Sequence, residues 1–197
     1  MSNFTLQSGI SALESLTEIL PQALDECVPP ILGCFGKLIV TGMGKAGLIG
    51  QKISATLRST GQPSAFLDPA QALHGDMGMI RPGDVLLALS NSGQTAEVEA
   101  VIMYARSHEI PVIAITSDAG SPIAGAADVS IVYPRMPEGC PIGRAPMAST
   151  MQMMAIGDAI AAELMMRRGF SDADFLALHH GGYLGQQIRE VVKPESD

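Results

Sequence analysis

The hydrophobic positions of the chain fall into short continuous runs that alternate with longer amphipathic stretches. Five runs are apolar almost throughout, and glycine, proline or short polar residues lie at their ends. These runs cover residues 37–42, 64–67, 84–89, 111–116 and 129–132. Strands without polar alternation are typical of parallel sheets that helices cover on both faces. The pattern therefore predicts five buried, parallel strands.

The stretches between the runs have the periodicity of helices. They predict helices over residues 44–59, 95–107, 122–127 and 147–168, and a short last helix that begins after Ser171 as its N-cap. At the N-terminus, one amphipathic helix is expected from Thr5 to Cys27, before Pro29 and Pro30. Its apolar face consists of Ile10, Leu13, Leu16, Ile19 and Leu20.

Strands that alternate with helices of ten or more residues imply right-handed crossovers and a parallel sheet. The expected fold is thus a doubly wound three-layer α/β/α sandwich with a five-stranded parallel sheet, formed as a single domain over residues 1–197. Ligands of such sheets bind beyond the carboxyl ends of the strands. The residues that directly follow the strands are therefore the candidates for function.

Composition narrows the classes of partner. The net charge is −8 and no basic run is present, which argues against a nucleic-acid-binding protein. No apolar stretch reaches membrane-spanning length and the N-terminus lacks a leader pattern, so we expect a cytoplasmic protein with no membrane partner. The cysteines, Cys27, Cys34 and Cys140, form neither a disulfide framework nor a metal motif. An acidic chain can bind an anion only locally, through backbone N–H groups and a few side chains.

The loop after the first strand leaves two interpretations open. Gly42, Gly44 and Gly47 match the G-x-G-x-x-G pattern, and Asp68 ends the second strand, near where a dinucleotide fold places its ribose-binding acid. Glycine is also common wherever a strand turns tightly into a helix. Lys45 favours an anionic ligand or a developing oxyanion instead, although a single lysine is usually a solvated surface residue.

The loop after the third strand favours a phosphate. It leads directly into a helix, whose first N–H groups and positive dipole end attract anions. One hydroxyl would suffice for an ordinary N-cap, whereas this loop carries several polar groups. It consists of Ser90, Asn91, Ser92, Gly93, Gln94 and Thr95. Glu97 follows in the first turn, where it could complement the helix dipole or, beside a sugar, move a proton between adjacent carbons.

The histidines do not indicate a metal site. His108 lies in a polar helix end, His74 lies in a glycine-bearing segment, and His179 and His180 precede two glycines. No pair has the spacing of zinc ligands, so we expect neither a metal nor another cofactor.

Together these segments resemble the arabinose-5-phosphate isomerases, a family with the sugar-isomerase (SIS) fold. The motifs G-M-G-K-[SA]-G, H-G-D-[LM]-G-M, S-N-S-G-x-[ST]-x-E and H-x-G-G occur in this order, and Cys140–Pro146 is similar to C-P-L-G-x-A-P. The resemblance covers nearly the whole chain. Such isomerases continue into paired CBS domains. Because this sequence ends at Asp197, the resemblance implies the isomerase domain alone.

The resemblance implies an aldose–ketose isomerase that interconverts ribulose 5-phosphate and arabinose 5-phosphate, in lipopolysaccharide or capsule precursor biosynthesis. The family has an active-site Lys, His, Glu and His, and the matching positions of this chain are Lys45, His74, Glu97 and His179. Its substrate-binding positions fall on Gly44, Ser90, Asn91, Ser92, Gly93 and Thr95. Three residues depart from the family pattern: Ala46 replaces a common Ser, Leu178 replaces a Ser and His180 replaces a Pro.

Three alternatives remain open from the sequence. One is an isomerase of another sugar phosphate, because other isomerases of this fold act on hexose or heptose phosphates. A sugar-phosphate sensor would need the loop at Ser90 but not Glu97, and a dinucleotide-dependent oxidoreductase would use the three glycines and Asp68. For assembly, the methionine-rich helix over residues 147–168 is apolar nearly all round, which predicts burial on more than one side. We therefore expect a homotetramer, and the resemblance implies that His179 reaches the site of a neighbouring chain.

Overall fold

The computed structural model of the chain describes residues 2–179. The strands are β1 (Leu38–Gly42), β2 (Ser64–Leu67), β3 (Val85–Leu89), β4 (Val112–Thr116) and β5 (Val129–Val132). The longer helices are α1 (Ser2–Glu14), α2 (Leu20–Leu32), α3 (Gly44–Ser59), α5 (Ala96–Ser107) and α7 (Ala148–Arg168). The short ones are α4 (Pro69–Ala72), the 3-10 helix η1 (Asp76–Met79), α6 (Pro122–Ala126) and α8 (Asp172–Leu178). The predicted strands are confirmed to within one residue, whereas α4 and η1 were not expected.

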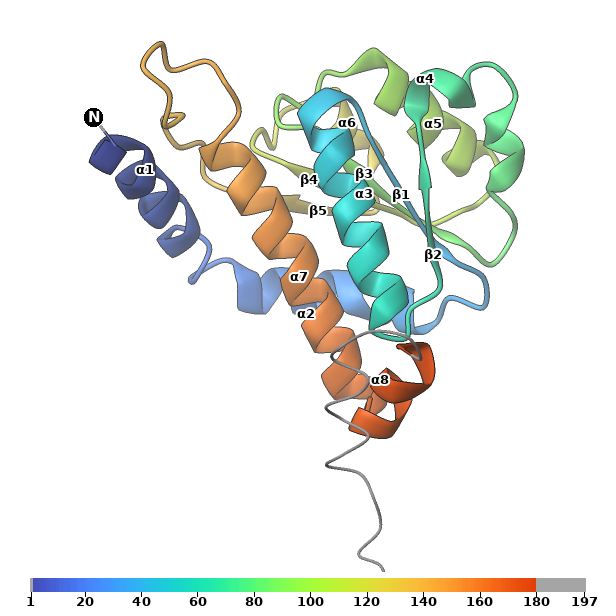
Figure 1. The fold of residues 1–197 in the computed structure, drawn as a ribbon. Coiled ribbons are helices and arrows are strands. Elements are labelled where there is room, and N and C mark those ends of the chain that lie inside the picture. The colour runs from blue at the N-terminus through green and yellow to red at the C-terminus, as the bar shows by residue number, and fades with distance from the viewer. Residues whose placement is uncertain (1, 180–197) are drawn as a thin grey trace, which may run out of the picture.

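The sheet has the order β2-β1-β3-β4-β5, and every neighbouring pair is parallel (Figure 1). From β1 the chain first moves to β2 on one side and then returns to β3 on the other. The connections after β1 and β3 therefore diverge to opposite faces of the sheet. In doubly wound sheets this switch point is where ligands bind.

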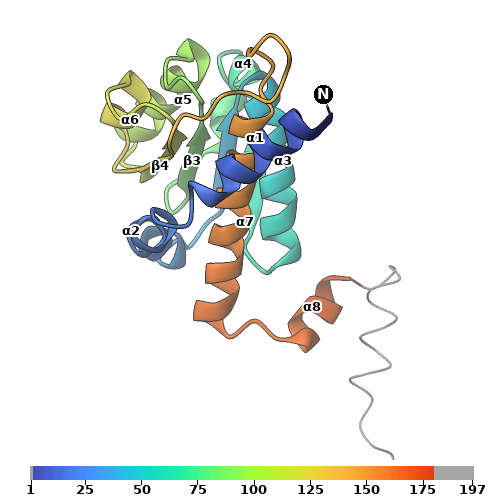
Figure 2. The same cartoon turned by 90° about the vertical axis from the view of Figure 1, so that its left-hand side faces the viewer.

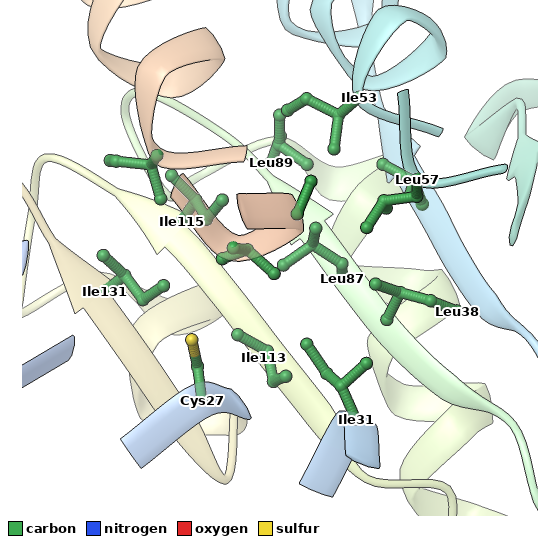
Figure 3. Packing of buried hydrophobic residues seen from close by; sticks show 14 of the residues in the cluster. Cys27, Ile31, Leu38, Ile53, Leu57, Leu87, Leu89, Ile113, Ile115 and Ile131 are labelled. Carbon is green, nitrogen blue, oxygen red and sulfur yellow. The ribbon is translucent and has the colours of Figure 1, made fainter. Parts of the chain in front are cut away.

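Helices cover both faces of the sheet, as the sequence predicts. One cluster packs Leu38, Leu87 and Ile113 of the strands against α2, α3 and α7, and Figure 3 shows this packing. On the opposite face, Ile39 and Leu86 pack against α4, α5 and α6. Successive residues of each central strand point to opposite clusters, so the strands are buried throughout. The three-layer α/β/α fold is confirmed.

The prediction of one N-terminal helix over residues 5–27 is wrong. The chain forms α1 and α2 with a turn between them, in which the hydroxyls of Ser15 and Thr17 donate to the carbonyls of Ala12 and Glu14. Such local bonds compete with helix hydrogen bonds, and Pro21 then lies in the first turn of α2, where proline is tolerated. The turn lets Leu16 enter the core with only 2% exposure.

Helix α7 is covered by other helices of its own chain. It packs against α3, α1 and α2, and Figure 2 shows α1 lying across it. The apolar character of α7 therefore needs no partner subunit to explain it, contrary to the argument from its methionines. On α7 itself Met166 is exposed, and α1 carries four exposed apolar side chains, Phe4, Leu6, Ile10 and Leu13. Across residues 2–179, no helix is both long and apolar enough to span a membrane.

Candidate active site

A cavity of about 500 Å³ lies at the switch point of the sheet. Met43 and Lys45 follow β1 at its edge, Ser90 follows β3, and Tyr133 follows β5. Its remaining wall comes from the loop before α7 and the first turns of that helix. Lining residues there are Arg135, Met136, Pro137, Glu138, Gly143, Arg144, Pro146, Ser149, Thr150, Gln152 and Met153. The cavity thus lies where a parallel sheet of this order binds ligands.

The glycines of the first loop serve the packing of α3 against β1. Gly44 begins α3 with φ +61°, and a Cβ on Gly47 would overlap the carbonyl oxygen of Gly42. Asp68 uses its carboxylate as the N-cap of α4, because Oδ1 accepts from Ala70 N at 2.9 Å. Local structure therefore accounts for the features that suggested a dinucleotide. Lys45 is exposed and lines the cavity.

The loop after β3 is held in one shape by its own hydroxyls. Ser90 Oγ and Thr95 Oγ1 are 2.9 Å apart, and Gly93 N donates to Ser90 Oγ at 3.1 Å. Thr95 occupies the N-cap position of α5 but makes no side-chain capping bond. This disfavours the simple capping interpretation, since the cap hydroxyl is engaged by Ser90 rather than by the helix. Ser90, Asn91, Ser92 and Thr95 line the cavity, so polar groups surround the positive end of α5.

Glu138 is a carboxylate in the cavity wall that the sequence analysis did not single out. Its Oε2 accepts from the backbone N–H of Met147 at 2.6 Å and of Ala148 at 2.7 Å, while Oε1 accepts from Ser149 Oγ. It therefore caps α7 with a negative charge, which suits the dipole of that helix. The only sequence signal was an acid in the loop before a long helix, which does not distinguish a cap from a catalytic group.

Gln152 ties three distant segments together beside the cavity. Its side chain is fully buried, and Nε2 donates to Ser15 Oγ and to the carbonyl of Pro134, both at 3.0 Å. Within the described part of the chain, Oε1 of Gln152 has no hydrogen-bond partner. Arg135 and Arg144 add two cations to the cavity wall beside Lys45, against the one carboxylate of Glu138. An anionic ligand therefore finds local positive charge in an acidic chain.

The structure does not bring all of the expected catalytic residues to this cavity. Glu97 is half-buried in the first turn of α5, and His74 is exposed just beyond α4; neither lines the cavity. His179 ends α8, where its ring stacks on Phe175 with the ring centres 3.8 Å apart. In Figure 2, α8 lies beyond the carboxyl end of α7, while the cavity lies at its amino end. His180 lies outside the described residues.

No group of three or more His, Cys, Asp or Glu side chains within residues 2–179 is arranged to hold a metal ion. Hydroxyls, an amide, backbone N–H groups and three cations instead converge at one cavity. This donor set fits a phosphate ester, and the cavity leaves room beside the phosphate for the rest of a small polar ligand.

Known proteins resemble this chain in sequence. The SIS domain family model matches residues 31–163. Arabinose 5-phosphate isomerase KdsD from Shigella flexneri is 42% identical over 176 residues, which are 89% of this chain and 54% of that protein. The protein of the same name from Pseudomonas aeruginosa is 43% identical over 177 residues, 90% of this chain and 54% of its own length. The chain thus spans about half the length of these curated relatives.

A solved structure of similar size has the same fold. It is Escherichia coli CFT073 c3406 in complex with arabinose 5-phosphate, which matches with a TM-score of 0.83 and 34% sequence identity. The match covers 91% of this chain and 95% of that chain. Together with the family model, which matches more than half of the residues, this likeness shows that the chain belongs to the SIS domain family.

Proposed function

We propose that the chain is an aldose–ketose isomerase that interconverts D-arabinose 5-phosphate and D-ribulose 5-phosphate. The observation that carries the proposal is the Ser90–Thr95 loop, which presents its polar groups to the cavity at the amino end of α5. The names of the relatives and the sugar-phosphate ligand of the solved structure support this substrate. The enzyme would work in the cytoplasm and catalyse an early step toward lipopolysaccharide or capsule precursors.

In the proposed reaction, a carboxylate removes the proton from C2 of the aldose while the carbonyl oxygen at C1 gains one. The electron pair of the broken C–H bond forms the double bond of an enediol. Return of a proton to C1 and loss of the proton on the C2 hydroxyl give the ketose. Lys45 would stabilise the negative oxygen, and His74 and a partner's His179 would assist proton transfer at the oxygens. Gly44 and the Ser90–Thr95 loop, including Gly93, would bind the phosphate end.

Glu97 is the proposed base, and Glu138 is the alternative that the cavity itself suggests. Glu138 lines the cavity, but hydrogen bonds to the first turn of α7 already engage its oxygens, which weakens a carboxylate as a base. Glu97 has no such bonds within residues 2–179 and lies in the first turn of α5, two residues after Thr95. Reaching C2 from there requires substrate to extend along the start of α5.

The deciding experiment is an isomerisation assay with a panel of pentose and hexose phosphates. We expect conversion of arabinose 5-phosphate in both directions, without added cofactor or metal, and incorporation of solvent deuterium at C2. Tight binding of sugar phosphates without turnover of any of them would favour a sensor instead. Activity that is lost with chelator and restored only by a divalent ion would contradict the metal-free mechanism.

A further inference from the structure

Tyr133 is a buried tyrosine whose hydroxyl is directed at the phosphate loop. It follows β5, its side chain is 1% exposed, and Tyr133 N donates to the carbonyl of Thr116 at 3.0 Å. Its hydroxyl donates to Oδ1 of Asn91 at 2.8 Å. The tyrosine thus joins the end of β5 to the loop that follows β3, across the end of β4.

The backbone of Asn91 is fixed independently of this bond. Its carbonyl oxygen accepts from Ser117 N at 3.1 Å and from Ser117 Oγ at 2.8 Å. Asn91 lines the cavity, and its Nδ2 makes no hydrogen bond to another group within residues 2–179. The side-chain amide therefore has its oxygen engaged by Tyr133, while its NH₂ group has no hydrogen-bond partner among residues 2–179.

The orientation of this amide decides whether it attracts or repels a phosphate. An asparagine side chain has a carbonyl end that only accepts and an NH₂ end that only donates. A phosphate oxygen is an acceptor, so a rotated amide would place one acceptor against another. Burial raises the pKa of the Tyr133 phenol well above its usual value, so the hydroxyl keeps its proton and remains a donor.

We propose that Tyr133 is a positioning residue for phosphate binding, because its hydroxyl holds the Asn91 amide with both N–H groups toward the ligand. The proposal rests on the proposed function only in that the Ser90–Thr95 loop binds a phosphate. It adds a residue from the end of β5 to a phosphate site whose predicted residues follow β1 and β3.

The test is titration of the folded protein with inorganic phosphate, with binding measured by calorimetry or phosphorus NMR. Tyr133→Phe removes the hydroxyl alone, and we expect the Kd for phosphate to rise about 3- to 10-fold, as for loss of one hydrogen bond. Asn91→Ala should raise the Kd at least as much. In the Asn91→Ala background, Tyr133→Phe should have no further effect. Tyr104→Phe on α5 is the matched control, because Tyr104 packs against His108 away from the cavity, and its Kd should equal that of the wild type.

The outcomes separate this proposal from the proposed function. Unchanged phosphate binding in Asn91→Ala would overturn the phosphate loop itself. Weaker binding in Asn91→Ala with wild-type binding in Tyr133→Phe would overturn only the role of Tyr133. An equal loss from Tyr133→Phe with and without Asn91 would mean a general structural effect, and would also overturn it.

A second variant keeps the proposal testable if Tyr133→Phe does not fold. Asn91→Asp retains an acceptor for the tyrosine but has no N–H donors. We expect it to keep the thermal stability of the wild type and to lose phosphate binding. Wild-type affinity in Asn91→Asp would contradict the assignment. With sugar phosphate as substrate, Tyr133→Phe should raise KM by the same factor and change kcat little.

Discussion

Gly93 is the residue of the phosphate loop with the least freedom to change. Its φ is +65°, and a Cβ there would overlap the side chain of Ser121. Gly44 has nearly the same φ, +61°, but open space around it. We expect Gly44→Ala to cost about 1–2 kcal/mol of the free energy of unfolding through backbone strain alone. Gly93→Ala should cost about 1–3 kcal/mol more, because overlap adds to strain; denaturant titration measures both. Equal costs would contradict the overlap.

Glu97 carries the proposed proton transfer. Glu97→Gln keeps the size and hydrogen-bonding reach of the side chain but cannot take the proton from carbon, so kcat should fall by about 10²- to 10⁴-fold. Binding of sugar phosphate should stay within a few-fold of the wild type. Glu99→Gln is the matched control, since Glu99 lies in the same first turn of α5, and it should keep full activity.

The same assay distinguishes the two carboxylates. If Glu138→Gln loses turnover and solvent-deuterium exchange while Glu97→Gln keeps both, the base is Glu138 and the assignment to Glu97 is wrong. Both variants should be compared at equal substrate saturation, so that changes in KM do not hide the effect on kcat.

At the residue scale, the sequence predicted the part of the site that follows single strands. Lys45 and the Ser90–Thr95 loop could be found because each directly follows a buried apolar run, and such positions share one edge of a parallel sheet. Tyr133 also directly follows a predicted strand, so the same rule could have found it. Glu138 and Gln152 could not be found this way. They reach the cavity through tertiary packing of a loop and a helix, which leaves no local pattern. The roles of Glu97, His74 and His179 stay predictions.

At the element scale, α7 depends on a cap that lies nine residues before Met147. Glu138→Ala removes the acceptor of two backbone N–H groups and of Ser149 Oγ. We expect a loss of about 1–2 kcal/mol in the free energy of unfolding, measured with denaturant. Glu18→Ala, in the exposed turn before α2, is the control and should change stability by no more than about 0.5 kcal/mol. Similar losses in both variants would mean that charge alone, and not the cap, is responsible.

A buried thiol on helix α2, that of Cys27, makes the stability of the fold fall at alkaline pH. Burial raises the pKa of the Cys27 thiol from 9.0 to about 12. The folded state therefore keeps this proton at a pH where the unfolded chain has lost it. The resulting stability is fully present below pH 9 and is lost as the pH rises from 9 toward about 12.

This one thiol contributes at most about 1.4 kcal/mol per pH unit to the decline of the free energy of unfolding with pH. Cys27→Ala should lower stability at pH 7 through lost packing, yet flatten the decline above pH 9, as measured by urea unfolding at several pH values. Cys34→Ala is the comparison, because Cys34 is less buried and its removal should flatten the decline less. Parallel curves for wild type and Cys27→Ala would contradict the expectation.

The elements themselves were predicted well where hydrophobic burial alone determines them. The strands and α3 follow the apolar runs and the glycine boundaries closely. The break between α1 and α2 was missed because the apolar spacing continues through it, while hydroxyl-to-carbonyl bonds at Ser15 and Thr17 end the helix. Periodicity reports which face is apolar, not where the backbone changes direction.

At the scale of the whole molecule, the position of His179 requires either a second subunit or a different role. Helix α7 has 21 residues and so extends about 30 Å, with the cavity at its amino end and α8 beyond its carboxyl end. We propose a homotetramer in which His179 of one chain completes the cavity of another. The exposed apolar residues Phe4, Leu6, Ile10 and Leu13 of α1 offer a surface for such contacts.

Complementation tests the shared site. Glu97→Gln subunits and His179→Ala subunits should each be inactive, and a mixture under exchange conditions should regain part of the activity. Mixed assemblies can then pair an intact Glu97 with an intact His179. A monomer by light scattering, or no recovery despite demonstrated exchange, would rule out the arrangement. His108→Ala, at the end of α5, serves as the control and should stay active alone.

The packing of α1 on α7 also has a consequence for synthesis on the ribosome. The two helices are separated by more than a hundred residues of sequence. At about 5–20 residues per second, α1 leaves the ribosome roughly 7–30 s before α7 has been made. During that interval the face of α1 that later packs against α7, and that carries the buried Ala12, is not yet covered by α7. The nascent chain therefore depends on delayed docking, and α1 reaches its final place only after α7 has been made.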